Sequence, residues 1–364
     1  MNKNFVAYRY PGDGEKCHFA IYEDNDIVLT ESFMDIGSRS CFVFAPFKVS
    51  GTEPIVMFCN KAANPFTIRE LRQIFKSSIN REKSTQQNFR IGETIDNSSD
   101  YHEDFECFHS AVCAGDLRKV VLARSSQIHY DGAVDIFELF AKACNNYPNS
   151  FVTLVNSNVS GMWLVATPEI LCEKVGNSLH TISLAGTMNL SDKIDKHIEN
   201  GEPVAKIWSK KNIEEQELVS FHIESVLRNI SNTIDKSKPK TVRAGNLVHI
   251  RTDFNLRLDN NISIGEVLQV LHPTPAVCGF PVEKAMQIIG KEHLDRKYYS
   301  GFCGSVDSEN DTRVFVTLRC MQLHANNKIE LYAGGGILQD SNEYDEWNET
   351  VYKMQTILRC LMAQ

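Results

Sequence analysis

Short runs of apolar residues separated by turns mark the first quarter of the chain. Ser40 to Phe47 and Pro54 to Cys59 are dense in Val, Phe, Ile and Met, which predicts two strands. Thr67 to Phe75 has the apolar spacing of a short helix. Residues 77 to 100 are polar and rich in turn formers, which fits either a linker or a long surface loop.

The periodicity becomes clearer after residue 100. Phe105, Phe108 and Val112 share one face of a predicted helix that ends near residue 115. The dipeptide Gly176-Asn177 predicts a hairpin turn. The strands expected around that turn and before it are residues 119–124, 151–155, 162–166, 170–175 and 180–184.

The second half of the chain alternates longer elements with loops. Polar residues 189 to 203 predict a loop, and an amphipathic helix is expected from about Val204 to Ser231. The remaining predictions are a strand at 248–258, a helix at 264–271, strands at 314–323 and 329–333, and a closing helix. Because strands cluster with few helices between them, we predict an α+β fold with largely antiparallel sheets.

Composition narrows the class of protein. The 364 residues are 42% hydrophobic and 23% charged, as in a globular protein. A net charge of −8 argues against nucleic-acid binding, and no run reaches the roughly 18 apolar residues of a membrane helix. The eleven cysteines form no C-x-x-C pair, and the first twenty residues lack the apolar centre of a signal peptide. We therefore expect a cytoplasmic protein.

A glycine run and a charged helix near the C-terminus are the first candidate site. Gly334 to Gly336 follow an apolar strand, which is compatible with a simple bend from strand to loop. Glu346, Glu349 and Lys353 then share one helix face, where two carboxylates can hold a hard cation and an ammonium group can hold its anion. A solvated helix face with an ordinary Glu–Lys pair is the alternative.

Two upstream residues could supply acid–base chemistry. Lys119 opens a strand that is apolar on both faces, so its amine either reaches water at the strand end or is desolvated. Desolvation favours the neutral amine, which can act as a general base. Glu169 follows Thr167-Pro168 at a strand start and either faces solvent or is a buried general acid.

Further segments combine glycine, proline and polar side chains. Gly186 and Thr187 end a strand, where glycine permits close approach of a ligand. His272 and Ala276 lie in the proline-stiffened segment LHPTPA, and His272 is also compatible with a structural role. Arg319 interrupts an apolar strand and needs an anionic partner. Glu214, Glu215 and Glu217 form a charged helix patch, and one of them could join a magnesium site. The glycine run matches no nucleotide-binding loop.

Taken in order, these segments resemble those of the chorismate-utilising enzymes. The similar segments are KVVLAR, TPE, LAGT, the Glu-Glu pair, LHPTPAVCGFP, SGFCG, TLRC, YAGGGI and EWNE-x3-K, over about residues 102–360. The resemblance implies the fold of anthranilate synthase component I. Residues 1–100 match loosely and form the N-terminal part, residues 101–364 form the chorismate-binding region, and both belong to one continuous domain.

The resemblance also implies roles for individual residues. Within the family the chain is most similar to isochorismate synthases, because water-adding members begin the KVVLAR-like strand with a lysine. Lys119 is then the base that activates water at C2 of chorismate, and Glu169 the acid that protonates the departing C4 hydroxyl. Glu215 and Glu349 are implied Mg2+ ligands, with Glu346 nearby. The implied substrate-binding residues are Gly186, Thr187, His272, Ala276, Arg319, Gly334 and Lys353.

Other functions stay open at this point. A salicylate synthase makes isochorismate and then eliminates pyruvate, and no residue decides between the two reactions. An anthranilate-type synthase is opposed by Lys119, and Ala185 stands where aminodeoxychorismate synthases carry a nucleophilic lysine. A non-catalytic binder of dicarboxylates needs neither the base nor the acid. We expect chorismate as the small-molecule partner, neither nucleic acid nor membrane, and a monomer or weak homo-oligomer.

Overall fold

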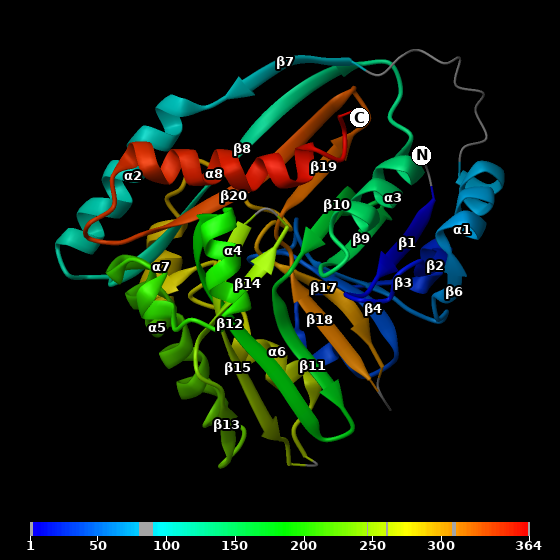
Figure 1. The fold of residues 1–364 in the computed structure, drawn as a ribbon. Helices are drawn as coiled ribbons and strands as arrows, with labels where there is room; N and C mark the ends of the chain where they lie inside the picture. Colours follow the sequence, from blue (N-terminus) through cyan, green and yellow to red (C-terminus); the bar gives the residue numbers. More distant parts are fainter. Residues whose placement is uncertain (1–2, 80–89, 246, 260, 308–310, 363–364) are drawn as a thin grey trace.

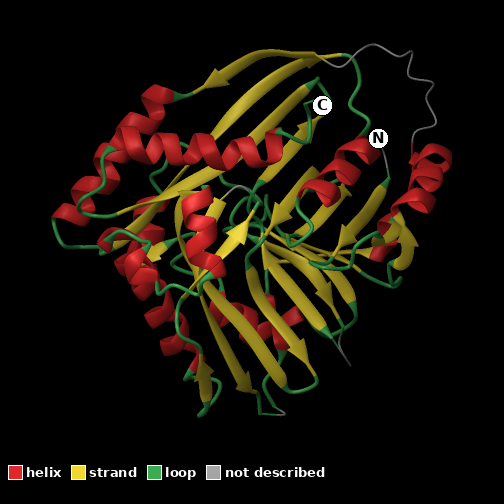
Figure 2. Cartoon of the chain, viewed as in Figure 1, coloured by secondary structure: helices red, strands yellow, loops and turns green. Residues whose placement is uncertain are grey.

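The computed structural model describes residues 3–79, 90–245, 247–259, 261–307 and 311–362. Across these ranges the strands form two ten-stranded sheets, and within each sheet every pair of neighbouring strands is antiparallel. Figures 1 and 2 show the strands at the centre of the molecule with the helices around them. The predicted α+β fold with largely antiparallel sheets is therefore confirmed.

The first sheet follows the order β16-β8-β20-β19-β10-β9-β1-β2-β6, and β7 pairs with β8. Its strands are β1 (Asn4–Arg9), β2 (Lys16–Tyr22), β6 (Asn64–Thr67), β7 (Arg90–Asp96), β8 (Lys119–Asp131), β9 (Phe151–Ser157), β10 (Gly161–Thr167), β16 (Gly279–Phe280), β19 (Cys320–His324) and β20 (Lys328–Ile337).

The second sheet follows the order β13-β15-β12-β11-β18-β17-β4-β5-β3, and β14 pairs with β15. Its strands are β3 (Ile27–Thr30), β4 (Cys41–Ala45), β5 (Ile55–Phe58), β11 (Ile170–Val175), β12 (Ser178–Asn189), β13 (Ile234–Lys236), β14 (Lys240–Ala244), β15 (Leu247–Arg257), β17 (Phe302–Val306) and β18 (Thr312–Val316). The first 100 residues thus contribute strands to both sheets.

The α-helices lie outside the sheets, and several begin at a side-chain cap. The Ser263 hydroxyl accepts from the Glu266 N–H and the Glu266 carboxylate accepts from the Ser263 N–H, which fixes the start of the predicted helix at Ile264. The helices are α1 (Ile68–Ile74), α2 (Ser98–Cys113), α3 (Ile136–Asn146), α4 (Asp192–Glu199), α5 (Lys210–Leu227), α6 (Ile264–Leu271), α7 (Val282–Ile289) and α8 (Glu343–Leu358). None of the described helices has the length and apolarity needed to span a membrane.

Several predicted elements differ from the structure. The predicted loop 189–203 contains α4, and the helix expected from Val204 begins only at Lys210 because Ser209 caps it there. The segment 77–100 contains β7 and the start of α2, and its residues 80–89 lie outside the described part. The expected strand 314–323 divides into β18 and β19, which belong to different sheets. Helices α3 and α7 are not among the predicted elements.

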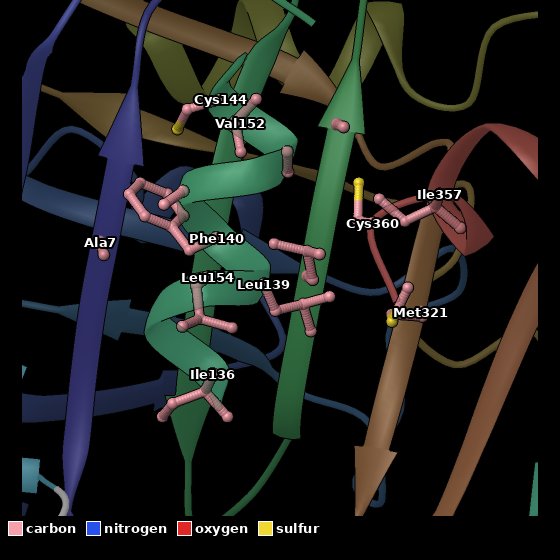
Figure 3. Packing of buried hydrophobic residues seen from close by; sticks show 14 of the residues in the cluster. Ala7, Ile136, Leu139, Phe140, Cys144, Val152, Leu154, Met321, Ile357 and Cys360 are labelled. Atoms are coloured by element: carbon pink, nitrogen blue, oxygen red, sulfur yellow. The ribbon is translucent and has the colours of Figure 1, made fainter. Parts of the chain in front are cut away.

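Apolar side chains fill the space on both sides of the first sheet. Trp163, Phe44 and Phe315 belong to a cluster between the two sheets, where Phe44 comes from β4 and Trp163 from β10. On the outer face, α3 packs Leu139 and Phe140 against β1, β9 and β19 (Figure 3). Burial of such side chains contributes about 1.5–3 kcal/mol each, so the two sheets are held as one rigid frame for the site.

Candidate active site

The chain crosses between the two sheets several times, and two of these crossings lie next to each other. The first sheet's β10 leads to β11 of the second through Pro168 and Glu169, and β18 of the second sheet leads to β19 of the first through Arg319. The Val316 N–H donates to the Glu169 carbonyl over 3.0 Å, and the Ala166 N–H donates to the Arg319 carbonyl over 3.1 Å. Backbone bonds therefore hold the two crossing segments together.

The Glu169 and Arg319 side chains line one cavity with residues from eight further segments. The predicted site residues that line it are Glu169, Gly186, Thr187, Glu215, Ala276, Arg319, Gly334 and Lys353. These residues are up to 184 positions apart in the sequence, and the fold brings them together. Lys119 contacts Glu215 and Glu349 contacts Lys353, both members of this set, whereas Glu346 contacts Lys211 and Ser341.

Lys119 is buried at the start of β8 and forms an ion pair with α5. Its side chain has no exposed surface, and its Nζ lies 2.9 Å from Oε1 of Glu215. Burial acts to raise the pKa of Glu215, but the charges of Lys119, Lys353 and Lys211 hold that pKa below its ordinary value. Of the two alternatives for Lys119, the structure has the desolvated amine rather than a side chain that reaches water.

The glycine run is part of strand β20 and not a bend after it. Gly334, Gly335 and Gly336 pair with β8, while β19 pairs with β20 only up to Tyr332. A Cβ atom on Gly336 would lie 2.6 Å from Oε1 of Glu215 and 2.8 Å from Cε of Lys119. Glycine is therefore required here because any side chain would displace the Lys119–Glu215 pair.

Helix α8 supplies the predicted charged face beside this strand. The Lys353 ammonium donates to the Gly334 carbonyl over 2.7 Å and lies 2.7 Å from Oε1 of Glu349. Oε1 of Glu346 accepts from the Ser341 hydroxyl over 2.6 Å. Burial raises the pKa of Glu346, and the negative charge of Glu349 raises it further. Figure 1 shows α8 lying across β20, which places this face at the cavity.

Glu169 has the properties of a general acid. Its side chain is 4% exposed, and burial raises its pKa to about 7 although the positive charges of Lys119, Lys353 and Arg319 oppose the shift. A carboxyl group with this pKa is protonated in a large fraction of molecules near neutral pH. It can therefore donate a proton to a leaving group in the cavity.

Arg319 is a buried cation without an anionic partner. It is 7% exposed, and no carboxylate among the described residues forms an ion pair with it. Its guanidinium donates to Nε2 of His249 over 3.1 Å and to the Thr356 hydroxyl over 3.2 Å. Its φ of 49° is uncommon for a residue other than glycine, as is often found at functional sites. The arrangement favours an anionic ligand.

Three residues at the site are absent from the sequence prediction. His249 donates through Nδ1 to the Gly186 carbonyl over 2.8 Å, and burial and the Arg319 charge lower its pKa to about 3, so it is neutral and accepts from Arg319. Tyr299 also lines the cavity. Lys211 contacts Glu346 from α5. A histidine inside the apolar strand LVHI was the available signal for His249, whereas Lys211 lies in an ordinary charged stretch.

His272 is a predicted site residue that neither lines the cavity nor forms an ion pair with a charged residue of the site. Its Nε2 contacts the Phe47 carbonyl at 3.0 Å, and its ring packs against Phe33 and Phe302. Burial lowers its pKa to about 4, so the ring is neutral. These contacts correspond to the structural role that the sequence left open.

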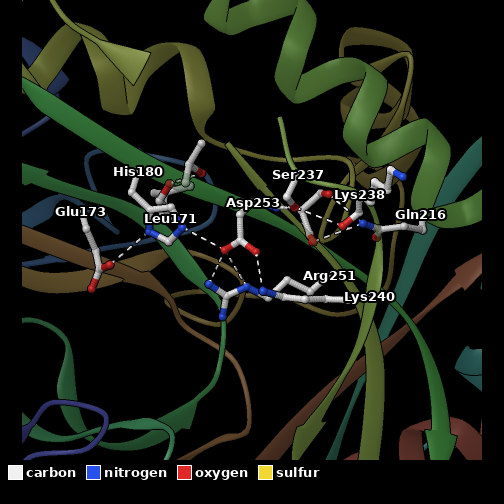
Figure 4. Close-up of polar contacts among 11 residues, drawn as sticks. Leu171, Glu173, His180, Gln216, Ser237, Lys238, Lys240, Arg251 and Asp253 are labelled. Carbon is white, nitrogen blue, oxygen red and sulfur yellow. Dashed lines mark hydrogen bonds and ion pairs between the residues drawn. The ribbon is translucent and has the colours of Figure 1, made fainter. Parts of the chain in front are cut away.

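Polar contacts on the second sheet hold the strand that carries Gly186. His180 on β12 lies between Glu173 on β11 and Asp253 on β15, at 3.2 Å and 3.0 Å (Figure 4). The side-chain amide of Gln216 donates to the Ser183 hydroxyl over 2.7 Å, which joins α5 to β12. The register of β12 shifts after Ala185, where Gly186 has a φ of +71° that favours glycine.

The three predicted metal ligands are all carboxylates. Glu215, Glu346 and Glu349 each have a lysine partner, and within the described ranges no three metal-ligating side chains are close enough to hold an ion as they stand. A set of carboxylate oxygens beside an anion-binding cavity has the chemistry that Mg2+ prefers. The donor types therefore fit this ion, provided that the lysine contacts rearrange.

Comparisons with known proteins show which proteins the chain is similar to. In sequence, the chain is 34% identical to isochorismate synthase EntC of Escherichia coli over 66% of the chain, and 33% identical to the vibriobactin-specific isochorismate synthase of Vibrio cholerae, also over 66%. The chain covers 61% of the length of each relative.

In structure, it superimposes on MenF, the menaquinone-specific isochorismate synthase of Escherichia coli, with a TM-score of 0.81 at 20% identity, covering 99% of this chain and 89% of that one. Anthranilate synthase component I of Streptococcus pneumoniae gives a TM-score of 0.68 at 14% identity, covering 98% and 92%. These two likenesses concern the fold. The model of the family described as chorismate binding enzyme matches residues 6–362, and the chain therefore belongs to that family.

Proposed function

We propose that this protein is an isochorismate synthase that converts chorismate to isochorismate in an Mg2+-dependent reaction. The observation that carries the proposal is the cavity itself. Its lining includes a buried carboxyl group with a pKa of about 7 and a buried arginine that has no ion pair in the described structure, and the lining residue Glu215 contacts the buried Lys119. A protein that only binds a dicarboxylate needs the arginine but not the acid and the base.

In the proposed reaction, Lys119 takes a proton from water as the water oxygen bonds to C2 of chorismate. The two ring double bonds shift, the C4–O bond breaks, and Glu169 gives its proton to the departing hydroxyl group, which leaves as water. One water enters and one leaves, so the reaction is an isomerisation. For this step the Lys119 amine first has to be released from its contact with Glu215.

Arg319 and Lys353 hold the carboxylates of the substrate in this scheme. The support for Arg319 is its lack of an anionic partner in the described structure, and Lys353 lines the same cavity. The backbones of Gly186, Ala276 and Gly334 shape the space for the ring. Glu215 and Glu349 would hold Mg2+, with Glu346 nearby. The ion would orient a substrate carboxylate and stabilise its charge.

The names of the relatives favour isomerisation over the alternatives. EntC of E. coli and the V. cholerae relative are both named isochorismate synthases. The names point to two different pathways. The V. cholerae relative is named vibriobactin-specific, whereas the structural neighbour MenF is named menaquinone-specific. We propose a biosynthetic role of this kind without assigning one of the two pathways.

Chromatography of the products from chorismate tests the proposal. With Mg2+ we expect isochorismate alone, and a metal chelator should abolish its formation. Release of pyruvate with salicylate would assign the chain to the salicylate synthases instead. Binding of chorismate without any product would leave a non-catalytic binder.

A further inference from the structure

Three lysines neutralise the three carboxylates proposed to surround the metal. The pairs are Lys119 with Glu215 at 2.9 Å, Lys353 with Glu349 at 2.7 Å, and Lys211 with Glu346 at 2.5 Å. Three negative and three positive charges therefore balance without any ion.

Lys211 differs from the other two lysines in what else it contacts. Lys119 is fully buried, and Lys353 lines the cavity and also donates to the Gly334 carbonyl. Lys211 lies in the first turn of α5, is not part of the cavity lining, and has a side chain that is 33% exposed. Its one ion pair in the described structure is with Glu346. Its ammonium group can therefore move into solvent without breaking a second polar contact.

Glu346 cannot leave in the same way. Its side chain is 3% exposed, and Oε1 is also held by the Ser341 hydroxyl at 2.6 Å. The strand at Gly335 covers its other oxygen, since a Cβ atom there would lie 3.1 Å from Oε2. A buried carboxylate of this kind requires a counter-charge in every state of the protein. The partner can change, but the carboxylate stays where it is.

We propose that Lys211 is a built-in counter-cation, which neutralises Glu346 in the metal-free protein and withdraws when a divalent cation binds. The inference rests on the proposed Mg2+-dependent function. An ammonium group and a dication repel each other at contact distance, so they compete for the negative charge of the buried carboxylate. Lys211 thereby lowers the affinity of the empty site for cations and keeps the metal-free protein intact.

The test compares Lys211→Met with Lys210→Met. Lys210 lies on the same helix turn, is exposed, and has no ion pair among the described residues, so both variants lose one charge and keep an unbranched side chain. Mn2+ serves as the probe because it also prefers oxygen ligands, and free Mn2+ is measured by electron paramagnetic resonance at constant ionic strength without chorismate. We expect Mn2+ to bind about tenfold more tightly to Lys211→Met, and with unchanged affinity to Lys210→Met.

A thermal measurement separates this role from a purely structural one. Without metal, Lys211→Met should unfold at a lower temperature than the wild type, because Glu346 has lost its counter-charge. Saturating Mg2+ should remove that difference, since the ion replaces the missing charge.

Two results would overturn the inference: an affinity of Lys211→Met for Mn2+ equal to or weaker than that of the wild type, or a difference in Tm that persists at saturating Mg2+. A wild-type protein that binds neither ion, with or without chorismate, would instead overturn the metal-dependent function.

Discussion

Glu169 and Arg319 lie on two adjacent segments that carry the chain from one sheet to the other, and both side chains line the same cavity. The positive charge of Arg319 acts to lower the pKa of Glu169, yet burial of the carboxyl group outweighs it and raises that pKa to about 7. An acid and an anion-binding group can therefore act side by side. The pH dependence of the enzyme follows from this balance.

The rate constant kcat/KM should fall as the pH rises through about 7, because Glu169 then loses the proton that it must donate. Glu169→Gln should reduce kcat about 10²- to 10⁴-fold, and its residual activity should lack this pH-dependent step. Steady-state kinetics from pH 5.5 to 9 measure both effects. An unchanged step in the variant would assign it to another group.

Glu169 should also make the stability of the fold depend on pH. Its pKa is about 7 in the folded chain and near the ordinary 4.5 when unfolded, so the folded state binds more protons between these values and stability falls as the pH rises. Between pH 4.5 and 8 the wild type should lose about 3 kcal/mol relative to Glu169→Gln. Urea unfolding of both proteins at the two pH values measures this difference.

Lys119→Ala should abolish water addition, with kcat reduced by about 10³-fold, because no other amine occupies the start of β8. Binding of chorismate with Mg2+ should stay largely intact, since Arg319 and Lys353 remain. Single-turnover kinetics measure the rate of water addition, and equilibrium binding measures the affinity for chorismate. Near-normal turnover would remove Lys119 from the role of base.

Glu349→Ala should lose activity at ordinary Mg2+ concentrations and recover part of it when Mg2+ is raised. The reason is that one proposed ligand is gone while Glu215 and Glu346 remain. The apparent activation constant for Mg2+ is the quantity to measure. Full activity without added Mg2+ would speak against Glu349 as a ligand.

Gly336→Ala should inactivate the enzyme while the fold persists. The new Cβ would meet Oε1 of Glu215 at 2.6 Å and so separate it from Lys119. Gly51→Ala is the matched control, because its Cβ would lie at an ordinary 3.7 Å from Oε1 of Glu31. Activity and circular dichroism of both variants provide the comparison, and an active Gly336→Ala protein would contradict the role given to this glycine.

Arg319→Met should raise KM by about a hundredfold and at the same time raise Tm. The substrate loses a charged partner, whereas the protein no longer buries a guanidinium group without a carboxylate. Arg319→Lys restores the charge without the forked geometry and should recover part of the lost affinity. A lower Tm for Arg319→Met would mean that the bonds to His249 and Thr356 outweigh the cost of the buried charge.

Local patterns predicted the elements better than their arrangement. The helix Ile264–Leu271 follows from its cap and its apolar face, and the strands around Gly176-Asn177 follow from the turn. In contrast, residues 314–323 form one apolar run, and only the packing of two sheets divides it at Arg319. Helix α3 buries most of its residues but keeps Glu138 and Lys142 one turn apart on a partly exposed face, a helical pattern that the prediction missed.

At the site, too, the sequence predicted individual residues better than the contacts between them. Family-like segments led to Lys119, Glu169 and Arg319, whose chemistry is unusual for their surroundings. His249 and Lys211 escaped prediction because their importance lies in partners far along the chain, at Gly186 and Glu346. His272 had a suggestive motif, but its position among aromatic rings became visible only in three dimensions.

The pairing of β8 with β20 has a consequence for biosynthesis of the protein. The two strands lie about two hundred residues apart in the sequence, and the charged face of α8 comes later still. A growing chain on the ribosome therefore contains Lys119 and Glu169 long before it has the glycines and carboxylates that complete the site. Under the proposed function, partly synthesised chains should thus neither bind nor convert chorismate, because the site is complete only after helix α8 has been made and has folded onto the sheet.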